Sequence, residues 1–305
     1  MMLWRALLLL FTAASLSGCG VRMLYHQLDW LIPWQLQHYV TLDSSQRLEL
    51  EVLVEDRLDW HCRTQLPRYA EWLRAVEHDL RNQAVSAQWL TERADDAGVF
   101  WTELMRPLSH DLAAVLGEAS DAQIDELFRN LDARTREQMK AFVNREDHVL
   151  FQERAERLER RLRRWFGRMN ADQRARIQAW SEDLGLFGHE WLENRGRWQA
   201  QLRHALDASD RRPESLQPAL ERLMVHPEQS WSPDHVERLE RQRKATWLLL
   251  ADLYQMSSEG QRDRLITRAG RLARDFERLA CAIPVDAPPD YRTSDASKPG
   301  SMRAS

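Results

Sequence analysis

The chain has 305 residues, a formal net charge of −4 and 30% charged residues. Nucleic-acid-binding domains are usually basic, so this charge balance argues against nucleic acid as a partner. The length is enough to bury a sizeable core, in one elongated domain or in two small ones.

The first 19 residues have the pattern of a bacterial lipoprotein signal. Arg5 is followed by an apolar run over residues 6–11, by small residues, and by the closing tetrapeptide Leu16-Ser17-Gly18-Cys19. A secretory leader needs these parts in this order, and the run is too short to span a bilayer. We expect residues 1–18 to be a signal peptide and Cys19 to be acylated. A leader with a chance cysteine is the alternative.

The predicted lipid also indicates a location. Each buried methylene contributes about 0.8 kcal/mol, so several acyl chains on one cysteine hold a protein firmly on a membrane. Gly20 follows the cysteine, at the position where aspartate signals retention in the inner membrane. The likeness to Gram-negative lipoproteins therefore implies the periplasmic face of the outer membrane.

Residues 19–41 form an aromatic-rich segment directly after the predicted lipid. It contains Tyr25, Trp30, Trp34 and Tyr39. Aromatic rings with a polar edge are favoured at membrane interfaces, but they also cap helical cores. We expect core packing for this segment, with membrane contact as the alternative.

The rest of the chain predicts an all-α fold, an elongated bundle of many helices. Good helix formers dominate, and apolar residues recur every three or four positions, as in Ile177, Trp180 and Leu184. We expect one helical body over 42–283, with a subdivision near 208–232, and a disordered, proline-rich tail over 284–305. The expected helices cover 44–64, 68–83, 87–115, 120–168 with a break, 170–207 bent by Gly185, Gly188 and Gly196, 214–224, 233–256 and 258–280.

One short pattern recurs where helices are expected to begin. Asp43, Ser120 and Asn170 each stand three positions before a glutamine, and residues 256–261 hold a looser copy with one residue inserted. A polar side chain at this spacing accepts a backbone hydrogen bond while the glutamine returns one, which is a capping box. Capping alone predicts small, separable losses of stability when the glutamines are removed.

Two resemblances accompany these motifs. The capped helix starts resemble the paired Leu-Thr-x-x-Gln motifs of the periplasmic Spy and CpxP stress proteins, with the threonine replaced here. The segment from Tyr25 to Trp34, followed by Tyr39-Val40, Trp60-His61 and Leu66-Pro67-Arg68-Tyr69, resembles a family of proteobacterial lipoproteins of unknown function. That resemblance implies a helical lipoprotein and supplies no activity.

Two cysteines remain after the predicted lipidation site, Cys62 and Cys281. In an oxidising periplasm they could form a structural disulfide, whereas small buried thiols are the alternative.

The expected helix around residues 153–168 carries an excess of arginine. Several arginines have a glutamate at the favourable i,i+4 spacing, but Arg161, Arg164 and Arg168 do not. A solvated face is the expectation. A binding strip for an acidic partner or phospholipid head groups is the alternative.

The sequence has no recognisable catalytic motif. His189 and Glu193 share a helix face, but a zinc site would need a histidine at the second position and a third ligand. We expect no metal, no cofactor and no enzymatic activity. The leading interpretation is a helical binding or chaperone-like lipoprotein with an envelope protein partner. The alternatives are a structural link between the outer membrane and the cell wall or a membrane complex, and a hydrolase of lipid or wall.

Overall fold

The computed structural model describes residues 18–82, 85–140, 145–186 and 188–281. Within these ranges the chain forms helices and no strand, which confirms the predicted all-α class. The elements are α2 (Gly18–Tyr25), α3 (Leu28–Leu36), α4 (Ser44–Trp60), the π-helical turn η1 (His61–Gln65), α5 (Leu66–Arg81), α6 (Ala87–Gly117), α7 (Asp121–Lys140), α8 (Asp147–Phe166), α9 (Ala171–Asp183), α10 (Gly188–Ala208), α11 (Pro213–Val225), the 3-10 turn η2 (Pro227–Ser230), α12 (Pro233–Gln255) and α13 (Glu259–Leu279).

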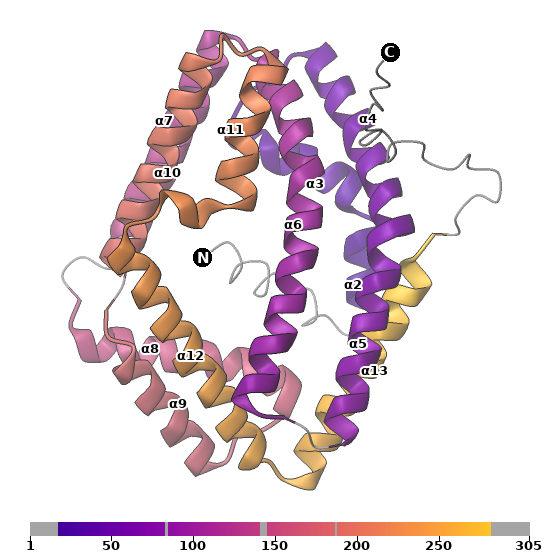
Figure 1. Cartoon of the computed structure of the whole chain (residues 1–305), viewed down its shortest axis with the longest axis vertical. Coiled ribbons are helices and arrows are strands. Elements are labelled where there is room, and N and C mark those ends of the chain that lie inside the picture. Colours follow the sequence, from indigo (N-terminus) through magenta and orange to yellow (C-terminus); the bar gives the residue numbers. More distant parts are fainter. Residues whose placement is uncertain (1–17, 83–84, 141–144, 187, 282–305) are drawn as a thin grey trace, which may run out of the picture.

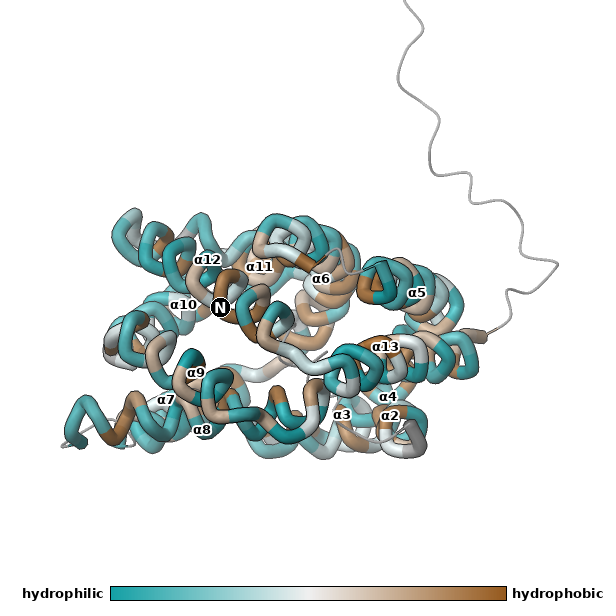
Figure 2. Tube along the Cα trace, turned by 90° about the horizontal axis from the view of Figure 1, so that it is seen from below, coloured by the Kyte–Doolittle hydropathy of each residue, from teal (hydrophilic) through white to brown (hydrophobic). Residues whose placement is uncertain are grey.

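Most helices lie side by side in pairs. Helices α5 and α13 form one edge of the molecule, α7 lies along α10, and α6 runs beside α11 (Figure 1). Helix α8 packs on α9 and on α13, so it links the second half of the chain to the α5–α13 pair. Figure 2 shows α6, α11 and α12 on one side of the molecule, with α3, α4, α7 and α8 on the other.

The buried apolar side chains form four clusters. The largest joins α8, α9, α12 and α13 around Leu162, Ile177 and Leu253. A second joins α2, α5 and α13, a third joins α6, α7, α10 and α11, and a small one lies under α4. Full burial of such a side chain stabilises the fold by roughly 1.5–3 kcal/mol. The helical stripes in the sequence are therefore core stripes.

The predicted long helix over 170–207 is wrong, because the structure has two helices there. Helix α9 ends at Asp183, and Gly185 has a φ of +61°, a conformation that glycine adopts at little cost. Gly188 begins α10, whereas Gly196 lies inside α10 without a break. The spacing of apolar residues continues across this boundary, so it gave no sign that α9 ends before Gly185.

The other boundaries agree with the expected ranges to within a few residues. The predicted break within 120–168 separates α7 from α8, and residues 208–232 contain α11 and η2. Because α11 packs against both α6 and α10, this stretch is part of the helical body. The predicted subdivision stays a prediction. Residues 1–17 of the predicted signal peptide and the whole predicted tail, 284–305, lie outside the described residues.

The recurring glutamines pair with one another across the fold. Gln46 and Gln123 exchange amide hydrogen bonds of 3.2 and 2.6 Å, while each also closes the capping box of its own helix. In addition, Gln46 Nε2 donates to Glu118 O, which follows α6, and Gln123 Nε2 donates to Thr41 O, which precedes α4. Each glutamine thus caps its own helix and also donates to a backbone carbonyl just before its partner's helix.

The same arrangement occurs a second time. Gln173 and Gln261 exchange amide bonds of 3.2 and 3.1 Å. Gln173 also donates to Leu253 O in the last turn of α12, and Gln261 donates to Arg168 O, just after α8. In this copy Ser258 caps α13 three positions before Gln261, so the inserted residue lies before the cap and leaves the spacing of the capping box unchanged. Four capping boxes therefore form two equivalent joints, each connecting two pairs of consecutive helices.

Candidate functional site

The aromatic segment divides into a packed part and an exposed part. Tyr25 lies against η1, and Tyr39 packs under Arg134, whose guanidinium carbon is 4.3 Å from the ring centre. Core packing is the wrong prediction for Trp30 and Trp34, which remain 52% and 48% exposed. Both lie on the short α3, and about half of each residue's surface is open to solvent.

The beginning of α2 lies beside the C-terminal part of α13, and Val21 is buried there in the cluster with α5. Nothing is described of the Cys19 side chain, and the leader before Gly18 lies outside the described residues. The predicted lipid attachment point, Cys19, thus lies in the first turn of α2, two residues before the buried Val21.

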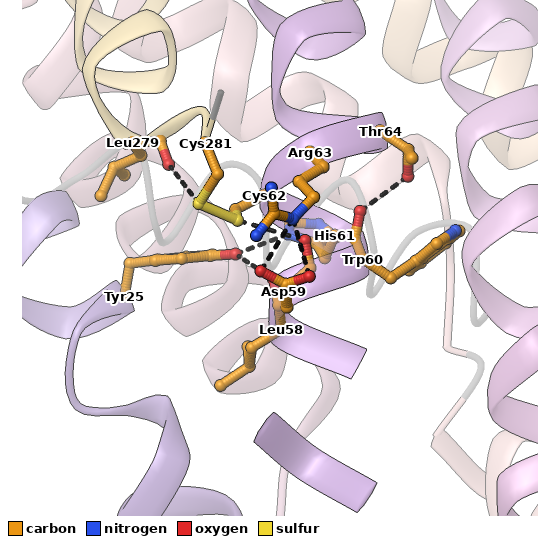
Figure 3. Close-up of a disulfide and its surroundings, with 10 residues drawn as sticks. All are labelled: Tyr25, Leu58, Asp59, Trp60, His61, Cys62, Arg63, Thr64, Leu279 and Cys281. Carbon is orange, nitrogen blue, oxygen red and sulfur yellow. Dashed lines mark hydrogen bonds and ion pairs between the residues drawn. A yellow bond between two sulfur atoms is a disulfide. The ribbon is translucent and has the colours of Figure 1, made fainter. Parts of the chain in front are cut away.

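Cys62 and Cys281 form a disulfide, with their Cα atoms 5.2 Å apart (Figure 3). Of the two alternatives that the sequence left open, the structure has the bridge. Cys62 lies in η1, and Cys281 follows the end of α13; the backbone N–H of Cys281 also donates to Cys62 O at 3.1 Å. Together these contacts fix the end of α13 to the α4–α5 joint.

Tyr25 and His61 extend this junction to α2. The Tyr25 hydroxyl lies 3.2 Å from Leu58 O and 3.1 Å from His61 Nδ1, and the two rings stack at 5.8 Å. Burial lowers the pKa of His61 to about 4, so the ring is neutral near pH 7. A neutral ring with hydrogen on Nδ1 can donate to Tyr25 while the hydroxyl donates to the carbonyl. The hydrogen bonds of Tyr25 and His61 therefore hold α2 against η1.

The predicted arginine strip lies on the outer side of α8. Arg161, Arg164 and Arg168 are exposed, in agreement with a solvated face. Helix α13 adds further arginines to the strip, and burial lowers the pKa of Arg268, with the nearby charges of Arg271 and Arg164 lowering it further. The strip therefore extends across two helices, which no spacing within α8 could indicate.

Arg154, which also lacks a partner at i,i+4, has a local role. Its guanidinium donates to Ser181 O at 3.2 Å and to Gly185 O at 2.8 Å, the carbonyls at the end of α9. Burial lowers its pKa to about 10, and it remains charged at neutral pH. A cation at a helix C-terminus stabilises the last turn, so Arg154 is a capping residue.

The structure contains a cavity, partly open to solvent, that no motif in the sequence indicates. It has a volume of about 230 Å³ and lies between α5, α6, α8, α12 and α13. Its walls are almost wholly apolar and include Trp72 and Val76 of α5, Ala97 and Phe100 of α6, and Leu250 of α12. An apolar cavity of about 150 Å³ already binds benzene, so this one is large enough for part of an organic ligand.

Three residues of these walls have a buried side-chain nitrogen that makes no hydrogen bond. Within the described part of the chain, Trp72 Nε1, Trp247 Nε1 and Arg93 Nε are buried without a hydrogen-bond partner. Arg93 is 27% exposed, and another of its nitrogens, Nη1, lies 3.3 Å from Asp96. A buried donor without an acceptor costs about 1–3 kcal/mol. These nitrogens are covered by neighbouring atoms, so what the cavity offers a ligand is apolar contact.

The described residues contain no group of three or more histidine, cysteine, aspartate or glutamate side chains arranged for a metal ion. The search of the same residues for a helix long and apolar enough to cross a bilayer found no candidate. His189, which the sequence offered as a metal ligand with Glu193, has no described side chain.

The fold and the cavity define an all-helical protein with an apolar interior site. The chain belongs to a family described as "Family of unknown function (DUF6279)", whose model matches residues 38–236. Neither a curated protein nor a solved structure matches the chain. The family match includes most of the cavity walls but ends before α13, which carries Gln261 and precedes Cys281.

Proposed function

We propose that this protein is a non-catalytic lipoprotein on the periplasmic face of the outer membrane, and that its helical body binds apolar groups in the cavity. The observation that carries the binding role is the apolar cavity itself. A protein partner, which the sequence analysis favours, would insert an apolar side chain of a client segment there.

The exposed rings of Trp30 and Trp34 support the membrane location in this proposal. They lie on α3, shortly after the predicted lipid at Cys19, and indole rings favour the interface between lipid and water. Core packing, the first expectation for these residues, would have given no such support.

Replacing Cys19 by serine should release the protein into the soluble periplasmic fraction with its fold intact. The thiol is the only atom to which the predicted diacylglycerol can attach, and α2 packs on the body downstream of it. Fractionation and circular dichroism measure the two parts of this expectation. A variant that still sediments with outer membranes after a high-salt wash would show that another element is the main anchor.

The cavity can be tested with N-phenyl-1-naphthylamine, an uncharged fluorophore that brightens in apolar surroundings. We expect saturable binding to the mature chain carrying Cys19→Ser. Ala97→Phe should weaken it at least about tenfold, because the new ring fills the space that the probe needs. Val99→Phe is the matched control, since Val99 lies on the same helix but is 51% exposed. Equal binding by both variants would place the probe elsewhere and contradict the proposed site.

A further inference from the structure

The arginines of α8 and α13 form one continuous cationic surface. Residues 160–168 hold five arginines and no acidic residue, and residues 264–274 hold four arginines and no acidic residue. The Arg268 guanidinium lies over the Trp165 ring of α8 at 5.6 Å, and the Arg264 side chain lies against Gly167, just after α8. The two runs are therefore neighbours in space. We define the arginine face by six exposed residues of this surface: Arg161, Arg164, Arg168, Arg264, Arg271 and Arg278.

The charges of the arginine face are not balanced within the fold. None of the six arginines forms an ion pair within the described part of the chain. Glu277 of α13 pairs instead with Arg74 of α5 at 2.8 Å, and Asp275 is buried, which raises the pKa of its carboxyl. Burial also lowers the pKa of Arg161, and the charges of neighbouring arginines lower it further, because like charges repel. Anions from outside the chain would relieve this repulsion.

Arg22 of α2 extends the arginine face to the predicted acylation site. Helix α2 packs on α13, and the charges of Arg278 and Arg22 both oppose the effect of burial on the pKa of Asp275, so Arg22 lies close to the end of the face. Arg22 follows Cys19 by less than one helical turn. The stretch from Arg264 to Arg278 is about 21 Å long, at 1.5 Å per residue. Figure 2 shows α2 and α8 on the same side of the molecule.

Exposed apolar side chains lie next to these cations. On α2, Met23 and Leu24 are 69% and 38% exposed. Helices that lie in a membrane interface combine basic residues with exposed apolar ones in this way. Acyl chains on Cys19 enter the bilayer, so they hold the first turns of α2 at its surface. The arginine face continues from α2 along α13, which places it beside the lipid head groups.

We propose that the arginine face binds the anionic head groups of the phospholipid membrane into which the lipid at Cys19 inserts. This inference rests on the membrane location in the proposed function and is independent of the cavity. The net charge of the chain is −4, so an anionic membrane attracts this face and repels the rest of the surface. Helices α8 and α13 then lie along the membrane. Because Trp165 and Leu272 of these helices also line the cavity, the cavity is held about one helix diameter, roughly 10 Å, from the head groups.

Sedimentation with vesicles tests the arginine face without the acyl anchor. The full mature chain carrying Cys19→Ser should bind vesicles of phosphatidylglycerol mixed with phosphatidylethanolamine, and it should not bind vesicles of phosphatidylcholine. Raising the salt from about 0.1 M to about 1 M should abolish the binding, because the screening length falls from about 10 Å to about 3 Å. This contact is therefore reversible, and it does not keep the Cys19→Ser variant on membranes through a high-salt wash.

Two sets of substitutions with the same change of charge locate the contact. Arg161→Gln, Arg164→Gln and Arg271→Gln together should weaken binding to the anionic vesicles about a hundredfold, since each arginine near an anionic surface contributes about fivefold. If the triple variant does not fold, Arg271→Gln alone should weaken binding about fivefold. The matched control neutralises three exposed cations of α12, on the other side of the molecule, and should change binding by less than about twofold (Figure 2). These cations are Arg241, Arg243 and Lys244.

Three outcomes would overturn the inference. Equal losses in the two triple variants would assign vesicle binding to net charge, and equal binding to both kinds of vesicle would exclude a role for charge. Binding of soluble polyglutamate without binding of either vesicle would identify an acidic polypeptide as the partner of the arginine face. The proposed acyl anchor fails by a different result, which is an unchanged fractionation of the Cys19→Ser variant in cells.

Discussion

Replacing both Cys62 and Cys281 by serine should lower the free energy of unfolding by about 3–5 kcal/mol. The two cysteines are 219 positions apart, so the bridge closes a loop that contains α5 to α13. A cross-link over so long a loop removes much conformational entropy from the unfolded chain, and this is its main source of stability in the chain-entropy model. Urea unfolding, followed by circular dichroism, measures the loss.

Reduction provides the matched control for this prediction. A reductant should destabilise the wild-type chain by a similar amount and leave the double-serine variant unchanged. If the reductant shifts both proteins equally, the effect does not come from this bridge. We expect the α5–α13 contact itself to survive, because it also rests on the buried side chains of Leu73, Leu272 and Phe276.

The bridge bears on location as well as on stability. Structural disulfides persist in oxidising compartments, and the periplasm is one. The disulfide therefore supports the proposed periplasmic position, by reasoning that does not depend on the lipoprotein signal. Cys62 and Cys281 lie on opposite sides of the family match boundary, which makes the bridge a feature to compare among family members.

The sequence predicted the helices well because each is determined largely by local signals. Asp43, Ser86 and Ser232 cap helices where the polar residue precedes an apolar period, and Pro233 begins α12 where its missing N–H costs nothing. Two errors were large. The helices α2 and α3 were not predicted, because residues 18–36 were interpreted only as an aromatic-rich segment. The helix over 170–207 was predicted as one because the apolar period continued past Gly185. Periodicity reports which face is buried, and it does not report whether the backbone turns.

The sequence could not predict the cavity, because its walls come from five helices that are distant along the chain. Each wall residue, for example Leu73, Ala97 or Leu250, reads as an ordinary core position in its own helix. Whether facing side chains fill the space between helices depends on the distances between helix axes, which a single sequence does not contain. Trp72 and Trp247 could not be singled out among 13 tryptophans for the same reason.

The paired glutamines lie between these two cases. The capping box that each forms in its own helix was predictable from the sequence, but the hydrogen bonds between glutamines of distant helices were not. Capping alone predicts small and separable effects. The structure instead leads us to expect a loss of about 2–4 kcal/mol for Gln173→Ala, since Gln173 is fully buried and its removal breaks the bonds to Leu253 O and Gln261 and leaves the Asn170 N–H without this acceptor. Chemical unfolding of the single variant measures this loss.

A double-mutant cycle then distinguishes a joint from two independent caps. Gln173→Ala and Gln261→Ala together should cost less than the sum of the single changes by about 1 kcal/mol or more, because each single change already breaks the amide pair. Gln46→Ala combined with Gln173→Ala is the matched control, since the two glutamines share no partner, and their losses should add. Additive losses within the Gln173–Gln261 pair would reduce the joint to two separate capping boxes. Coupling within that pair, together with additivity across pairs, would show that the same four-residue pattern that begins each helix also fastens α8 and α9 to α12 and α13.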